Sequence, residues 1–256
     1  METSGEVLER ELRYHEKLYS GFAQQHFARP AVRALRVHMV SRLLRLLPKP
    51  RSARVLSLGC GIGDTEILVA PHVKELHGVD LSPAAIRQAR QDSARLTNTR
   101  FFEGSLDSIR GQFDLVFGIF FLHHLPDSTL EAVPRKIARM LAPGGCFYAL
   151  DPNRYRLSGA IGSLLVPHLM RKYQTEDERE LDPVRTAAMF RGAGYGARVG
   201  YYDFLSSPLA GLFPGWRGGY TAARLGDDLL TRIPLLQRLG SNFELVASLP
   251  PPAEKD

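Results

Sequence analysis

The chain of 256 residues and 28.5 kDa has the length of one large domain, or of one core with appended segments. Apolar residues make up 44% and only two cysteines are present, which excludes a disordered chain, a collagen-like fibre and a disulfide scaffold. The net charge of +6 favours anionic partners but does not choose among nucleic acid, membrane surfaces and acidic substrates.

The N-terminal residues Met1–Glu6 contain no early apolar run, so we expect no signal peptide. No stretch of about 18 uninterrupted apolar residues predicts a membrane span. Two cysteines, Cys60 and Cys146, are too few for a framework of disulfide bonds. A reducing compartment is therefore the simpler interpretation. We therefore expect a cytoplasmic protein.

A basic stretch comes first in chain order. From Gln24 to Arg54 there are eight basic residues and no carboxylate. Within it, apolar residues at three- and four-residue spacing predict a helix over Ala31–Leu47, opened by Pro30 and closed by Pro48. One alternative is a helix packed on the core with its basic face in water. The other is a basic amphipathic helix that makes peripheral contact with an anionic membrane.

Beyond residue 52, short apolar runs alternate with helical patterns. Strands are predicted at Arg54–Leu58, Glu75–Asp80, Thr99–Glu103, Phe113–Phe117, Cys146–Asp151, Ala197–Phe204 and Phe243–Ser248. Helices are predicted from Asp64, from Pro83 with Ser82 as N-cap, over Asp127–Leu141 and over Val184–Gly192. Alternating units of this length indicate an α/β fold whose sheet is covered on both faces.

Two long segments do not fit a minimal α/β core, namely residues 153–182 and 205–241. Both carry apolar residues, and loops this long are usually functional or form their own helices. We interpret them, with an N-terminal helical part at residues 1–50, as a cap over the carboxyl edge of the sheet. The main domain would then be residues 51–256, with the two segments as insertions.

A glycine-rich turn follows the first predicted strand, with Gly59, Gly61 and Gly63 in a Gly-x-Gly-x-Gly pattern. Glycines let the chain turn tightly and bring bare backbone against a ligand. Asp64 stands where the dinucleotide motif has its third glycine, which disfavours a pyrophosphate and a nicotinamide-dependent oxidoreductase. Asp80 ends the next strand 21 residues after Gly59, the place of an acid that binds a ribose diol.

These motifs resemble those of the class I S-adenosylmethionine-dependent methyltransferases. VLSLGCGIG is similar to their first motif, HGVDLS to their second, FDLVFGIFFLHHL to the fourth-strand segment and LAPGG to the turn before the fifth strand. The resemblance implies a doubly wound, Rossmann-like, seven-stranded sheet with an antiparallel last strand and a helical cap. It also implies a site for S-adenosylmethionine formed by Gly59, Cys60, Gly61, Gly63, Asp80, Leu81, Ser105, Leu106 and Ile119.

Within that implied site, the glycine turn would lie along the methionine part, Asp80 would bind the ribose, and Leu81 and Leu106 would pack on adenine. The sequence departs from the family at two positions. Ser57 stands where the family commonly has an acid for the amino group, so Glu66 or Asp64 would have to substitute, unless both serve only the helix N-terminus. Ser105 stands where an aspartate often meets the adenine amino group.

Candidate catalytic residues come from two regions. His123 and His124 follow the fourth strand, and either would suit a general base, although one histidine of this segment often only anchors the loop. Tyr14 and Tyr19 in the N-terminal part would orient the acceptor or pack on the core. No metal site is expected, because no third ligand has convincing spacing.

Three further residues are candidates. Two lie where the fifth strand ends, at the carboxyl edge of the sheet, and one lies in the second insertion. Asp151 and Asn153 would hold acceptor atoms or cap a loop, and Trp216 is expected to be a packing anchor.

The predicted function is transfer of a methyl group to a small, hydrophobic or lipid-like acceptor. One alternative is an RNA methyltransferase, suggested by the basic N-terminal third. Against it, the fourth strand lacks the Asn/Asp-Pro-Pro-aromatic loop used on flipped bases, so no nucleic-acid partner is expected. The other alternative is a non-catalytic protein that binds the donor.

Overall fold

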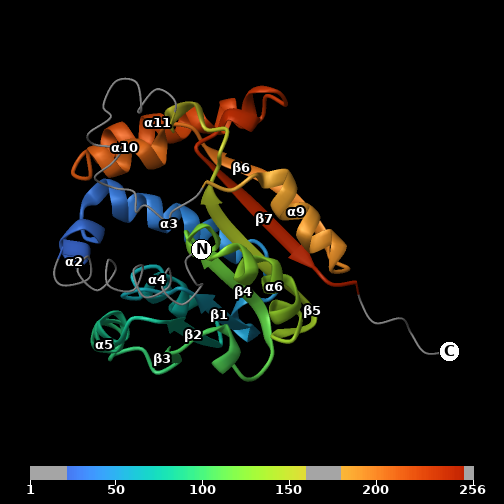
Figure 1. Ribbon diagram of the computed structural model, residues 1–256. Coiled ribbons are helices and arrows are strands. Elements are labelled where there is room, and N and C mark those ends of the chain that lie inside the picture. The colour runs from blue at the N-terminus through green and yellow to red at the C-terminus, as the bar shows by residue number, and fades with distance from the viewer. Residues whose placement is uncertain (1–21, 160–179, 251–256) are drawn as a thin grey trace.

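The computed structural model describes residues 22–159 and 180–250, which surround one central sheet (Figure 1). In these ranges the strands are β1 (Arg54–Leu58), β2 (Glu75–Asp80), β3 (Thr99–Glu103), β4 (Phe113–Ile119), β5 (Leu141–Pro152), β6 (Gly196–Asp203) and β7 (Asn242–Ser248). Their order across the sheet is β3-β2-β1-β4-β5-β7-β6. Strand β7 is antiparallel to both β5 and β6, and the other pairs are parallel. The expected fold class is confirmed.

Helices cover this sheet on both faces. They are α2 (Phe22–Phe27), α3 (Pro30–Leu44), α4 (Glu66–Val69), α5 (Pro83–Asp92), α6 (Asp127–Ala138), α9 (Pro183–Gly192), α10 (Ser206–Leu212) and α11 (Arg217–Leu230). Short 3₁₀ turns follow at Pro50–Ser52, Ala70–His72, Leu106–Ser108, Leu122–His124 and Leu236–Leu239. Among the described residues, no helix is both long and apolar enough to cross a membrane.

Two hydrophobic cores flank the sheet. One lies under α6 and α9, with Val133, Ile137 and Phe190 packed over β1, β4, β5 and β7. The other lies under α3, α4, α5, α10 and α11. Because the central strands β1 and β4 are buried on both faces, their residues are mostly continuous apolar runs rather than an alternating pattern.

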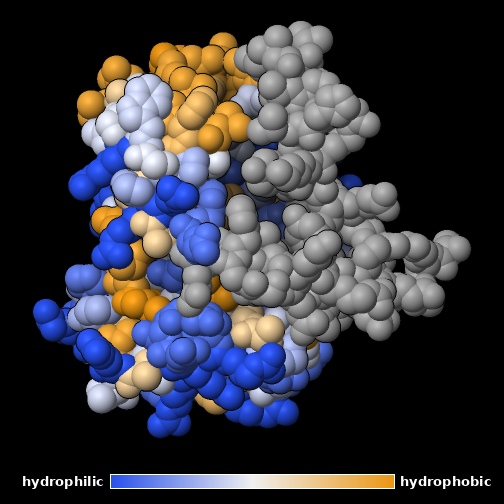
Figure 2. Space-filling view, turned by 90° about the vertical axis from the view of Figure 1, so that its left-hand side faces the viewer, coloured by the Kyte–Doolittle hydropathy of each residue, from blue (hydrophilic) through white to orange (hydrophobic). Residues whose placement is uncertain are grey.

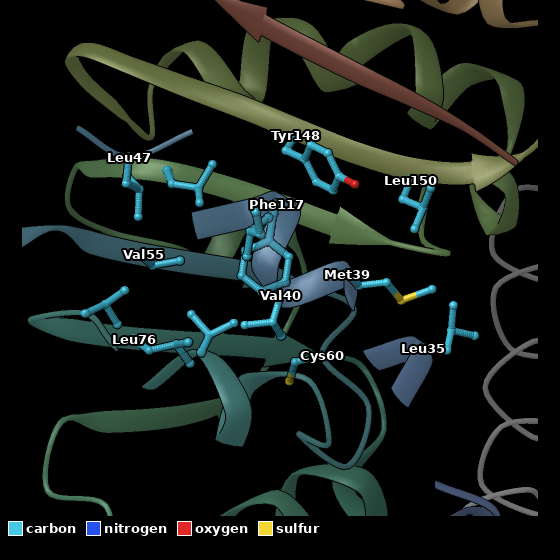
Figure 3. Close-up of a cluster of buried hydrophobic side chains, with 14 of the residues drawn as sticks. Leu35, Met39, Val40, Leu47, Val55, Cys60, Leu76, Phe117, Tyr148 and Leu150 are labelled. Carbon is cyan, nitrogen blue, oxygen red and sulfur yellow. The ribbon is translucent and has the colours of Figure 1, made fainter. Parts of the chain in front are cut away.

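Helix α3 belongs to the second core. Leu35, Met39 and Val40 of this helix belong to the same buried cluster as Val55 and Phe117 of the sheet, and Figure 3 shows Val40 next to Phe117. Of the two alternatives for this segment, the structure has the helix packed on the core. It ends at Leu44, three residues before the predicted end.

A buried polar cluster fixes α3 to the last strand. Arg42 donates from Nε to Glu244 Oε1 at 2.7 Å and makes a second bond from Nη2 to Oε2. The Tyr148 hydroxyl donates to the same Oε1 at 2.6 Å. Glu244 is only 5% exposed, so its carboxylate depends on these partners for stabilisation.

The turn before β5 differs from the prediction. Strand β5 already begins at Leu141, which pairs with Phe113, and α6 ends at Ala138 instead of continuing to Leu141. The register then shifts between Phe113 and Leu115. Pro143-Gly144-Gly145 therefore forms an irregular stretch inside the strand, where Gly144 has a φ of 77°.

The described parts of the predicted cap lie together at one end of the sheet. Residues 205–241 form α10, α11 and a 3₁₀ turn, and both helices pack on α3 (Figure 1). The amide of Ala31 donates to Pro214 O at 2.8 Å and joins the start of α3 to the α10–α11 turn. Of the other insertion, residues 153–159 and 180–182 are described.

We expect Arg42→Ala to lower the free energy of unfolding by about 2–3 kcal/mol, because it leaves the buried Glu244 carboxylate with Tyr148 as its remaining partner. Urea denaturation at pH 7 measures this change. Arg45→Ala is the matched control, since exposed Arg45 bonds within the described residues to Ser41 of its own helix and should change stability by less than about 0.5 kcal/mol. Equal midpoints for the two variants would contradict the role assigned to the pair.

Candidate functional site

A tight turn of left-handed backbone follows β1. Gly59, Gly61 and Gly63 have φ values of 64°, 53° and 77°, a region that side chains with a Cβ rarely adopt. A Cβ at Gly59 would lie 2.6 Å from the Phe121 ring. The glycines are thus needed for conformation, and at Gly59 for close approach as well.

Asp80 meets this turn from the end of β2. Its Oδ2 accepts a hydrogen bond from the Gly61 amide at 2.8 Å, and its Oδ1 accepts one from the Ser82 amide at 2.9 Å. The carboxylate is half-buried, and each oxygen keeps lone-pair capacity for a further donor. The glycine turn and Asp80, which the sequence suggested as parts of one site, are therefore in direct contact in the fold through Gly61.

The wall behind the turn is closely packed. Cβ atoms at Gly63 and Gly78 would lie 3.2 Å and 2.6 Å from the ring of Phe101. Cys60 lies in the same wall and is 5% exposed. Burial, helped by the Glu66 and Asp80 carboxylates, raises the pKa of the Cys60 thiol well above its ordinary value. This thiol therefore stays protonated at neutral pH, which fits a small packing residue.

Glu66 brings a carboxylate against Ser57, the residue that stands where the family commonly has an acid. Its Oε1 accepts a hydrogen bond from Ser57 Oγ at 2.6 Å. Its Oε2 is buried and has no hydrogen-bond partner. Burial raises the pKa of the Glu66 carboxyl to about 7, and the nearby Asp64 charge adds to the shift. A cationic amino group beside Oε2 would supply the missing partner and stabilise the ionised form.

Asp64 has a different role. Its Oδ2 lies 2.8 Å from Arg36 Nε of α3, and the Arg36 guanidinium stacks over the Phe27 ring at 4.8 Å. Phe27 packs in turn against Ile62 of the glycine turn. The N-terminal helices are thus fixed directly over the turn, and Asp64 is engaged by a cation of the chain itself.

The remaining predicted donor residues lie at the carboxyl ends of neighbouring strands. Leu81 is 36% exposed beside Asp80, and Leu106 is partly buried after β3. Ser105 is exposed, and its Oγ accepts from the Asp107 amide at 3.3 Å, so it caps a 3₁₀ turn. Ile119 is half-buried at the end of β4.

His123 is held by a buried acid. Its Nδ1 lies 2.8 Å from Asp151 Oδ1, and its amide donates to the same oxygen at 3.2 Å. The histidine is 6% exposed and the aspartate is fully buried. An ionised Asp151 accepts from Nδ1–H, which fixes the ring orientation and leaves Nε2 as the basic nitrogen. Asp151 Oδ2 is buried without a hydrogen-bond partner.

The other predicted candidates have different environments. The His124 ring lies 3.9 Å from that of His123 at 39°. Asn153 is buried, and its Nδ2 donates to Arg238 O and Gly240 O at 2.9 and 2.8 Å, so it caps a loop. Tyr14 and Tyr19 lie outside the described residues.

Two findings were not foreseen in the sequence. Phe120, just after β4, has a φ of 54°, an unusual conformation for a bulky residue, and such strain is common at functional sites. No local signal distinguishes it from the preceding strand residues. Trp216 is a correction: it was expected to be a packing anchor, but it is 59% exposed. The described ranges hold no cluster of three metal-ligating side chains.

Comparisons with known proteins show what this chain is similar to. A family model described as a methyltransferase domain matches residues 55–145. Trans-aconitate 2-methyltransferase of Deinococcus radiodurans is 33% identical over 44% of this chain and 43% of its own length. Ubiquinone biosynthesis O-methyltransferase of Xanthomonas axonopodis pv. citri is 29% identical over 64% of this chain and 70% of its own. The chain spans less than half the length of the first three curated relatives that it matches.

Solved structures show the same fold. The DhpI–SAH complex has a TM-score of 0.64 at 17% identity and covers 98% of this chain and 100% of its own. Magnesium protoporphyrin IX methyltransferase from Synechocystis, with bound SAH, has a TM-score of 0.60 at 14% identity and covers 90% of this chain and 88% of its own.

The Glu66 environment predicts a pH-dependent stability difference. Because the folded-state pKa lies at about 7 and the ordinary value is 4.5, folding favours the protonated carboxyl. The Glu66 carboxyl therefore makes its full contribution to the free energy of unfolding below about pH 4.5. This contribution is lost as pH rises through 7, and the total loss is about 3 kcal/mol. Unfolding curves of the wild type and Glu66→Gln at pH 4.5–8 should diverge by this amount, with the wild type losing stability. Parallel curves would show that folding leaves the pKa of Glu66 at its ordinary value.

Proposed function

Since the chain belongs to the class I S-adenosylmethionine-dependent methyltransferases, we propose that it transfers a methyl group from S-adenosylmethionine to a small, hydrophobic or lipid-like acceptor. The observation that carries this proposal is the contact between the glycine turn and Asp80, with 2.8 Å between the Gly61 amide and the carboxylate. It joins bare backbone and a diol-binding acid in one site.

The residues around the turn fit the donor. The orphaned Oε2 of Glu66 suits the donor's amino group, and Asp80 suits its ribose hydroxyls. Leu81, Leu106 and Ile119 offer apolar surface for the adenine. When bound, S-adenosylmethionine supplies a methyl group that is already activated on a sulfonium. The protein's main task is then to orient the acceptor, and positioning of this kind is worth up to roughly 7–11 kcal/mol.

His123 is our candidate for the proton-transfer residue. Asp151 fixes its ring through Nδ1, so Nε2 is the nitrogen that would take a proton from an acceptor hydroxyl. This step is needed for phenols or carbon acids, whereas a carboxylate acceptor is already ionised at neutral pH. Asp151 is then a positioning residue that acts through His123.

The proposed acceptor class rests on the cap and on the relatives. Helices α2 and α3 lie over the glycine turn, and α10 and α11 pack beside them, so an acceptor would approach under residues 22–47 and 205–241. One relative is named for trans-aconitate and another for O-methylation in ubiquinone biosynthesis, and these names support a small-molecule acceptor.

Nucleic acid is a weaker candidate on this geometry. Arg36 and Arg42, two of the basic residues in the N-terminal stretch, are paired with Asp64 and Glu244. Their charges are therefore neutralised within the fold and contribute little to phosphate binding.

We expect Asp80→Ala to weaken binding of S-adenosylmethionine and of its demethylated product by about 2–3 kcal/mol, or roughly 30- to 150-fold, because charge-assisted hydrogen bonds are lost. Isothermal titration calorimetry measures the affinity. Asp80 also accepts from Gly61 and Ser82, so thermal unfolding must show that the variant is folded. The control is Glu131→Ala, which changes an exposed acid on α6. Unchanged affinity in a folded Asp80→Ala variant would refute the assignment.

We expect His123→Gln to lower turnover of phenolic acceptors by roughly 10²–10⁴-fold and to leave turnover of carboxylate acceptors within about threefold. A radiolabelled methyl donor, with trans-aconitate and a set of substituted catechols as acceptors, measures both. His72→Gln, at an exposed histidine outside the site, is the control. Equal losses for the two acceptor classes would show that His123 only anchors the loop.

A further inference from the structure

Helix α11 is amphipathic, but its polar face points inward. The described structure buries Gly219, Tyr220, Arg224 and Asp227 of this helix. Leu225 and Leu229, one turn apart, are 65% and 67% exposed. A helix that packs on a core in the usual way has the opposite arrangement.

The inward polar residues have structural partners. Asp227 accepts hydrogen bonds from the amides of Leu205 and Ser206 at 3.0 and 2.9 Å, and so satisfies the N-terminus of α10. Arg224 donates to Tyr202 O at 2.9 Å and stacks over the Tyr202 ring at 5.3 Å. These contacts fix the rotation of α11, because turning its leucines inward would leave the buried Asp227 and two amides without partners.

The outward face continues into a large apolar surface. Nine of the fifteen large apolar side chains that are exposed in the described ranges belong to residues 205–239. Figure 2 shows hydrophobic atoms gathered at the top of the molecule, where Figure 1 places α10 and α11. We call this surface the α10–α11 patch, and it consists of Leu205, Leu212, Phe213, Trp216, Leu225, Leu229, Ile233, Leu235 and Leu239. Surfaces of this kind mark interaction sites.

The charges around the patch are basic. Arg217, Arg232 and Arg238 are exposed within the same segment, and exposed Arg29 lies two residues before Ala31, which is bonded to Pro214. Residues 205–241 contain two carboxylates: Asp227 is buried, and Asp228 is paired with Arg224 at 2.9 Å. The rim therefore attracts anions rather than cations.

Phe213 and Trp216 form an exposed edge-to-face pair, with 6.3 Å between ring centroids and an angle of 89°, at the turn between the two helices. Aromatic side chains of this type favour the interface between lipid headgroups and acyl chains. Leucines flanked by arginines and an aromatic pair are the composition of helices that lie in the plane of a membrane surface.

We propose that the α10–α11 patch docks onto the surface of an anionic lipid bilayer, with its leucines and Trp216 in the headgroup region and its arginines on the lipid phosphates. The patch is separate from the site at the glycine turn, so the proposal goes beyond the proposed function and does not depend on it. It also relocates the expected membrane contact, since the apolar face of α3 is buried.

Binding to lipid vesicles tests the proposal on the full chain without donor or acceptor, so a failure here leaves the proposed methyl transfer intact. Flotation with phosphatidylcholine vesicles, with and without phosphatidylglycerol, gives the bound fraction at low and high salt. We expect binding to anionic vesicles that weakens with salt. Trp216 is the chain's single tryptophan, so its emission should shift to shorter wavelength on binding.

The double variant Leu225→Glu, Leu229→Glu should bind anionic vesicles at least roughly tenfold more weakly, because two charges replace inserted leucines. Both side chains are exposed, so the fold should be kept, which thermal unfolding checks. Val184→Glu is the matched control, since Val184 is 64% exposed on α9, which covers the other face of the sheet.

Several outcomes would overturn the proposal. These are equal binding to neutral vesicles, no binding at low salt, or equal binding by the double variant and the wild type. A wild-type dimer in sedimentation that the double variant converts to monomer, without vesicle binding, would show instead that the patch joins two copies of the chain.

Discussion

The hydrogen bond between the Gly61 amide and Asp80 is the contact on which the site depends. It requires that β1 and β2 be parallel neighbours, so that both end at the same edge, and that the residues between them adopt left-handed backbone. Once these conditions are met, Cys60, Ser57 and Glu66 are fixed around the turn by packing and by the 2.6 Å Ser57–Glu66 hydrogen bond. The neighbouring ends of β4 and β5 then place His123 against Asp151.

Much of this fold could be predicted from the sequence, because its parallel strands are short apolar runs bounded by turn residues. The bounds of β1, β2 and β3 agree with the prediction, and Ser82 caps α5 by accepting from the Ala85 amide. The turn before β5 was less predictable. Leu141 continues the helical apolar pattern, and only its pairing with Phe113 decides that it joins the strand.

Only part of the site could be predicted from the sequence. The glycine spacing and Asp80 were evident, since both are consequences of backbone geometry at fixed positions. The contact of Ser57 with Glu66 was open, because Asp64 was an equal candidate until Arg36 of a distant helix was seen to engage it. The exposure of Trp216 could not be predicted either. It depends on the rotation of α11, which is set by the buried bonds of Asp227 and Arg224.

Helix α3 is bound at two separate points, through Arg36 to Asp64 beside the glycine turn and through Arg42 to Glu244 on the last strand. It therefore connects the glycine turn after β1 to the last strand, β7. A fragment starting at Pro48 would lack α3. One face of its sheet would be uncovered, and Asp64 and Glu244 would lose their arginine partners. Residues 30–44 are in this sense an integral layer of the folded domain, and truncation or domain-swapping schemes for this chain should keep them.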